Sequence, residues 1–140
     1  MTSIKSVCEA GQWLGQPLSS VRHTKISWLQ KRLILRRSKL KGEDVHNGPP
    51  IYWLGDRCET MVGSINGTVH KVIVVANVVP YFAENLFSDA LAEITKTLDV
   101  PCNPMPGGSM GWTVSDGHAV LGSHTAIGEH KLSLILTLNV

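Results

Sequence analysis

The sequence predicts an α+β fold, in which two helices pack on one face of an antiparallel β-sheet. Three observations support this class. Asn66-Gly67 separates two runs rich in β-branched residues, which is a strong signal for a hairpin. Apolar residues recur at helical spacing over 81–98, and leucines alternate with other residues over 131–139. We expect a single domain over residues 1–140, with the element order roughly α-β-β-β-β-α-β-β.

The segment from Ser3 to Leu14 predicts the first helix. Gly15 and Pro17 would end it, because glycine suits a helix C-terminus and proline cannot continue a helix. Four residues would lie roughly on one face of this helix: Ile4, Val7, Cys8 and Leu14.

The next segment, Arg22–Lys41, fits two structures. Ile26, Leu29, Leu33 and Leu40 share one side at helical spacing, whereas Ile26, Trp28 and Ile34 alternate as in a strand. Because the neighbouring segments resemble sheet, we predict two strands, near residues 24–29 and 32–37. Gly42–Pro50 is predicted as a loop, because it contains an Asn-Gly and a Pro-Pro pair.

The signals for sheet become stronger after this loop. Ile51–Leu54 predicts a short strand, and Thr60–Ile65 with Thr68–Ala76 predicts the hairpin. The second arm of the hairpin is almost wholly apolar and β-branched, which predicts a central, well-covered strand.

Tyr81–Leu98 is the second predicted helix. A break near Phe87 is compatible with the pattern, because Ser88-Asp89 resembles a fresh helix start. The apolar stripe consists of Phe82, Leu86, Ala90, Leu91, Ile94 and Leu98.

The C-terminal part predicts a loop and then strands. Pro101–Met110 is dense in proline and glycine, which predicts a loop. Trp112–Leu121, with a turn at Asp116-Gly117, and Lys131–Asn139 are the last predicted strands. If the final strand is an edge of the sheet, its unpaired backbone would join a second copy of the chain by strand addition.

The charges are segregated along the chain. Residues 1–42 carry nine Lys/Arg and one acid, Glu9, whereas residues 43–140 carry four Lys/Arg and ten acids. Three interpretations remain open for the basic segment: nucleic-acid binding, contact with a protein, or a solvated strand pair balanced by the acidic remainder. The candidate binding residues are Arg22, Lys25, Trp28, Lys31, Arg32, Arg36, Arg37, Lys39 and Lys41.

Three histidines and Cys58 are candidates for a chemical role. His118, His124 and His130 are spaced by six residues, so one continuous strand would place them on one face, as a zinc site requires. A turn-like sequence before His130 would break such a strand, so solvated loop histidines are the preferred interpretation. Cys58 lies beside Arg57, which would suit a tuned thiol, but an ordinary strand thiol is favoured.

Ser109 lies within a match to the G-x-S-x-G pattern at Gly107–Gly111. A hydrolase places this motif between a strand and a helix, whereas here it follows a helix and leads into a strand. We therefore predict no catalytic residue, no metal site and no cofactor.

The functional prediction is contact with other proteins. Three scattered cysteines and the lack of any run of about 20 apolar residues predict a cytoplasmic protein without membrane contact. The chain is predicted to be non-enzymatic and to act as an adaptor, or in an immunity-like or antitoxin-like role, including as a homodimer. The alternatives are a nucleic-acid-binding module that uses residues 22–41, and a small-ligand or catalytic pocket open to Cys58, His70 or Ser109.

Overall fold

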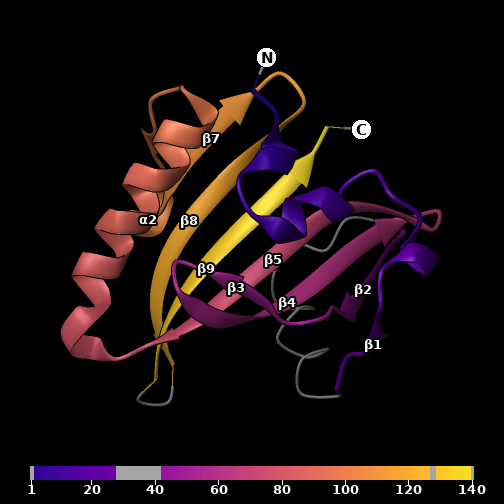
Figure 1. The fold of residues 1–140 in the computed structure, drawn as a ribbon, viewed down its shortest axis with the longest axis horizontal. Coiled ribbons are helices and arrows are strands. Elements are labelled where there is room, and N and C mark those ends of the chain that lie inside the picture. The colour runs from indigo at the N-terminus through magenta and orange to yellow at the C-terminus, as the bar shows by residue number, and fades with distance from the viewer. Residues whose placement is uncertain (1, 28–41, 127–128, 140) are drawn as a thin grey trace.

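The computed structural model describes residues 2–27, 42–126 and 129–139, and Figure 1 shows its fold. Its one α-helix in these ranges is α2 (Ala83–Leu98), and short 3-10 turns are η1 (Ile4–Ser6), η2 (Glu9–Trp13), η3 (Leu18–Ser20), η4 (Pro80–Phe82) and η5 (Pro106–Gly108). The strands are β1 (Thr24–Lys25), β2 (Glu43–Asn47), β3 (Ile51–Trp53), β4 (Asp56–Ile65), β5 (Thr68–Val78), β6 (Asn103–Pro104), β7 (Met110–Val114), β8 (Gly117–Ala126) and β9 (Glu129–Leu138).

These strands form one antiparallel sheet in the order β1-β2-β4-β5-β9-β8-β7-β6, and β3 pairs with β4. The predicted hairpin is confirmed as β4 and β5. Asn66 and Gly67 join its arms with φ values of 53° and 77°, the left-handed backbone that a tight two-residue hairpin turn requires. The prediction that the second arm is central is also confirmed, because β5 lies between β4 and β9.

The predicted fold class is wrong, because the described residues are mostly sheet with a single α-helix. Ser3–Leu14 forms the separate turns η1 and η2 instead of a helix. The backbone of Cys8 is extended between them, at φ −155° and ψ 175°. The chain then returns so closely that a Cβ at Gly11 would lie 2.5 Å from the Lys5 carbonyl oxygen. The apolar spacing identified buried residues, but a compact pair of turns buries them as well as a helix does.

The second predicted helix is present as α2. It begins at Ala83, after the turn η4, and continues past Phe87 without a break. It ends at Asp99, whose left-handed backbone (φ 54°) lets its N–H bond to the Thr95 carbonyl at 2.9 Å. The residues of the apolar stripe that are buried are Ala90, Ile94 and Leu98.

Two predicted loops contain strands. Within Gly42–Pro50, residues Glu43–Asn47 form β2, which pairs with β4. Within Pro101–Met110, Asn103 and Pro104 form the short edge strand β6. The glycine and proline signals concealed both strands, because backbone pairing needs only N–H and C=O groups and a proline is tolerated at an edge. The turn predicted near Asp116 is confirmed, and it separates β7 from β8.

The core lies on one face of the sheet. Figure 1 shows α2 running along β7 and β8, with the N-terminal turns beside it over β9 and β5. The Trp112 side chain is 1% exposed, and its indole N–H donates to the Thr95 hydroxyl of α2 at 3.0 Å. The predicted alternation of the last strand is confirmed, since its leucines 132, 134 and 136 are at most 1% exposed.

The last strand is not an edge of the sheet. β9 pairs with β5 on one side and with β8 on the other, so its backbone is used within the chain. The prediction that a second copy adds to this strand is therefore wrong. The single-domain prediction is not tested by these observations and stays a prediction.

Part of the basic segment lies outside the described residues. The strand predicted near 24–29 is observed only as β1, and the one predicted near 32–37 falls in the segment 28–41, which the structure does not describe. Among the helices that are described, none is long and apolar enough to cross a membrane.

Candidate functional site

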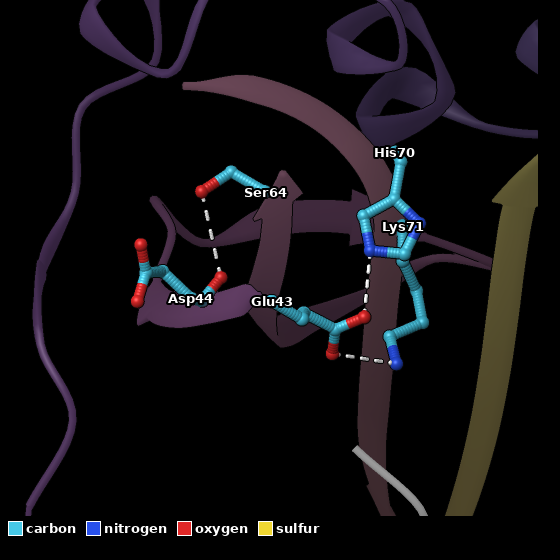
Figure 2. A network of polar contacts seen from close by, with 5 residues as sticks. All are labelled: Glu43, Asp44, Ser64, His70 and Lys71. Carbon is cyan, nitrogen blue, oxygen red and sulfur yellow. Dashed lines mark hydrogen bonds and ion pairs between the residues drawn. The ribbon is translucent and has the colours of Figure 1, made fainter. Parts of the chain in front are cut away.

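A buried carboxylate lies at the start of β2. Glu43 is 2% exposed, and its two carboxylate oxygens have different partners. Its Oε2 lies 2.6 Å from Nε2 of His70, and its Oε1 lies 2.9 Å from Nζ of Lys71 (Figure 2). We call these three residues the Glu43 cluster.

A bulge in the β4–β5 pairing creates this arrangement. Gly63 pairs with Lys71 whereas Ser64 pairs with Val69, so His70 is the extra residue of the bulge. His70 and Lys71, although consecutive, therefore both reach the same carboxylate. Glu43 lies on β2, which is separated from β5 in the sheet by β4.

The carboxylate packs closely against Gly63. A Cβ added at Gly63 would lie 3.2 Å from Glu43 Cδ and 3.4 Å from Lys71 Cε. The hydroxyl of Ser64 donates to the carbonyl of Asp44 at 3.5 Å, which joins β2 and β4 beside the cluster (Figure 2). The cluster thus connects three strands across a position that has no side chain of its own.

The Glu43 cluster is built to hold strands together. Glu43 and Lys71 balance one another in charge, and both carboxylate oxygens accept a contact, so the cost of burying the carboxylate is offset locally. Nδ1 of His70 is buried and has no hydrogen-bond partner among the described residues. His70 was a candidate for a pocket between sheet and helix, but the structure places it in this ion-paired network instead.

A second group of polar residues lies at the β8–β9 hairpin. The hydroxyl of Ser123 lies 2.6 Å from Nε2 of His130, and the hydroxyl of Thr125 lies 3.3 Å from Nδ1 of the same ring. Ser123 and Thr125 are exposed and His130 is partly buried. A hollow of about 410 Å³ opens here between the start of α2 and the sheet. The residues that line this Ser123 hollow are Ala83, Glu84, Phe87, Ser88, Gly108, Ser123 and His130.

The three histidines considered for zinc are not brought together. His118 and His124 lie on β8, an even number of residues apart and hence on one face. His130 lies on β9 opposite Thr125, so it faces the other side of the sheet. The described parts of the chain hold no group of three or more His, Cys, Asp or Glu that could bind a metal ion.

Cys58 and Ser109 have different surroundings. Cys58 is fully buried in β4, and burial, with a smaller contribution from the charge of Asp56, raises the pKa of its thiol. A raised pKa leaves less thiolate, which opposes a role as a nucleophile. Ser109 lies beside Gly122 in a neighbouring hollow of about 260 Å³, and it leads into β7 as the sequence indicated.

Of the nine candidate binding residues, the structure describes two. Arg22 and Lys25 are both exposed, Lys25 in β1 and Arg22 shortly before it. The other seven, Trp28, Lys31, Arg32, Arg36, Arg37, Lys39 and Lys41, fall outside the described residues.

An aromatic surface and the Ser123–His130 contact were both missed by the sequence reasoning. Val79, Tyr81 and Phe82 are 63%, 86% and 55% exposed, and we call them the aromatic corner. The sequence pattern places Phe82 in the apolar stripe of the second predicted helix and therefore predicts a core residue, whereas its side chain is exposed. Ser123 carried no signal, because the register of the last hairpin brings it to His130 and that register is not readable from composition.

Comparison with protein-family models, curated proteins and solved structures finds no match for this chain.

Proposed function

We propose that this protein acts through protein–protein contact, and that the contact is self-association centred on the aromatic corner. The observation that carries the proposal is the exposure of three large apolar side chains in four consecutive residues. Large apolar groups gathered at one surface position are typical of interaction sites, and aromatic residues contribute strongly to interface energies.

The corner holds its rings in a defined arrangement. The rings of Tyr81 and Phe82 pack edge to face, with centroids 5.0 Å apart and an interplanar angle of 87°. The turn η4 that carries them is closed by a bond from the Phe82 N–H to the Val79 carbonyl at 2.9 Å. A surface that is ordered before binding loses less conformational entropy when it binds.

The test compares the native chain with the double variant Tyr81→Ser/Phe82→Ser. We expect light scattering to show that the mass of the native chain rises with concentration toward that of a dimer, and that the double variant stays monomeric. Tyr52→Ser is the matched control, because Tyr52 is 74% exposed but lies on β3. A native chain that remains monomeric at every concentration would overturn self-association.

Nucleic-acid binding by residues 22–41 stays a prediction. Arg22 and Lys25 are exposed, as this role requires, but the greater part of the basic segment lies outside the described residues.

A further inference from the structure

The contact between Ser123 and His130 has the geometry of a nucleophile and its base. Thr125 pairs with His130 across the β8–β9 hairpin, and Ser123 pairs with Leu132. Ser123 is therefore a diagonal neighbour of His130 on the same face of the sheet, within reach of a side-chain contact. The separation of 2.6 Å between the Ser123 hydroxyl and Nε2 is the distance at which a base takes a proton.

The Thr125 contact is compatible with the form of the imidazole that a base needs. When the Thr125 hydroxyl accepts the Nδ1 proton, across 3.3 Å, Nε2 carries the lone pair that faces Ser123. The hydroxyl of Ser123 then donates to Nε2. A nucleophile, a base and a third group that orients the base are the elements of covalent acyl transfer, and they are present in this hairpin.

The Ser123 hollow supplies room for a small substrate. Its volume of about 410 Å³ is near the lower end of ligand sites. Phe87 provides an apolar part of the lining, and Gly108, at which a Cβ would meet no atom within 4 Å, leaves the hollow open where it contributes to the lining. Glu84, in the first turn of α2, brings negative charge to the hollow. The hollow therefore favours substrates that are small, partly apolar and free of negative charge.

We propose that Ser123 and His130 hydrolyse short-chain carboxylic esters that carry no negative charge. The Ser123 oxygen attacks the ester carbonyl carbon and its proton moves to Nε2 of His130. The ester C–O bond breaks, the alcohol leaves with that proton, and an acyl group remains on Ser123. Water then attacks the acyl group, His130 takes the proton from water and returns it to the Ser123 oxygen, and the carboxylic acid is released. This activity goes beyond the proposed self-association and does not depend on it.

The experiment measures hydrolysis of p-nitrophenyl acetate by the full chain and labelling by a fluorophosphonate probe. We expect one equivalent of label on Ser123, located by mass spectrometry of peptides. Ser123→Ala should lose the label and lower the hydrolysis rate by at least about 100-fold, because it removes the oxygen that attacks the ester. Ser115→Ala is the matched control, because Ser115 is an exposed serine in the turn before β8, and it should keep the native rate. Thermal melting of each variant confirms that it is folded.

Two results would overturn the proposal: a label on a different residue, or a Ser123→Ala variant that melts normally and keeps the native rate. The charge argument has its own test, in which p-nitrophenyl hemisuccinate should react more slowly than the acetate and Glu84→Gln should narrow the difference. Equal rates for the two esters would overturn that selectivity. The variant Tyr81→Ser/Phe82→Ser should hydrolyse the acetate at the native rate, so failure of self-association and failure of the esterase can be told apart.

Discussion

At the scale of single residues, Glu43 is a buried carboxylate whose two oxygens both have a side-chain partner. It is the acceptor for both His70 and Lys71, and its side chain is 1% exposed. Lys71 is 20% exposed and can turn toward water when its partner is lost, whereas His70 is 6% exposed and cannot. The Glu43 carboxylate therefore stabilises the fold chiefly because, without it, the buried donor groups around it would have no acceptor.

We expect Glu43→Ala to lower the free energy of unfolding by about 3 kcal/mol, since it leaves buried donors without an acceptor. Glu43→Gln keeps the shape and one acceptor oxygen, so its loss should be clearly smaller. Urea denaturation of the native chain and both variants gives the comparison. Equal losses for the two variants would contradict this account of the cluster.

The contact between Ser123 and His130 could not be predicted from the sequence of either residue's neighbourhood. From the sequence, His130 is a candidate only as part of a zinc site with His118 and His124, at a spacing that requires a continuous strand, and a solvated loop histidine is the preferred interpretation. The hairpin between β8 and β9 turns the chain before His130, and it replaces those partners with Ser123 and Thr125. Partners across a hairpin depend on its register, and a shift of one residue would move His130 to the other face.

At the scale of elements, β9 is the strand that holds the sheet together. Leu136 pairs with Val72 of β5 and with Ala119 of β8, and it is fully buried. Leu138 lies at the end of the same strand and is only partly buried. The two leucines look alike in the sequence, because both belong to the same alternating pattern.

We predict that Leu136→Ala lowers the free energy of unfolding by about 2–5 kcal/mol, because it leaves a cavity in a position flanked on both sides. Leu138→Ala should cost clearly less. Chemical denaturation measures both losses, and a small loss at Leu136 would indicate that β9 is not interior.

Elements with a strong local signal were predictable and the others were not. The hairpin at Asn66-Gly67 and the helix α2 depend on turn geometry and on spacing within one segment, so they were predicted correctly. β2 and β6 are strands because neighbouring strands pair with them. The partner of β2 is β4, after the intervening β3, whereas β6 pairs with the next strand, β7, and neither pairing is visible as a pattern within the short strand itself. The N-terminal turns follow the same rule, since their apolar residues are buried against distant strands.

At the scale of the whole molecule, Asp116 joins parts of the chain that lie far apart in the sequence. Its carboxylate accepts hydrogen bonds from the Ser3 hydroxyl and, at 2.9 Å, from the Ile4 backbone N–H. Its carbonyl accepts the Asn139 N–H at 2.8 Å. One turn, between β7 and β8, therefore binds both the N-terminal turns and the end of β9.

This contact predicts a dependence of stability on pH. Burial alone raises the pKa of the Asp116 carboxyl, but the bonds from Ser3 and Ile4 outweigh burial and hold the pKa below its ordinary value. Because the pKa is lower in the folded state, the stabilisation is complete above the ordinary carboxyl pKa of about 4 and is lost as the pH falls through the folded value. Asp116→Asn should remove this part of the acid sensitivity. Urea midpoints measured from neutral to acidic pH test it, and identical slopes for variant and native chain would contradict it.

β5 and β9 are neighbours in the sheet but lie far apart in the sequence, and this has a consequence for folding kinetics. The β4–β5 hairpin and the β8–β9 hairpin each join residues that are close in the sequence, whereas Val72 meets Leu136 only after α2 and three further strands have been passed. Closing so long a loop costs entropy before its contacts form. We therefore expect the hairpins to form first and the pairing of β5 with β9 to limit the rate at which the sheet is completed. A chain in which this pairing is delayed would expose the leucines of β9 for longer, and we expect it to aggregate more readily.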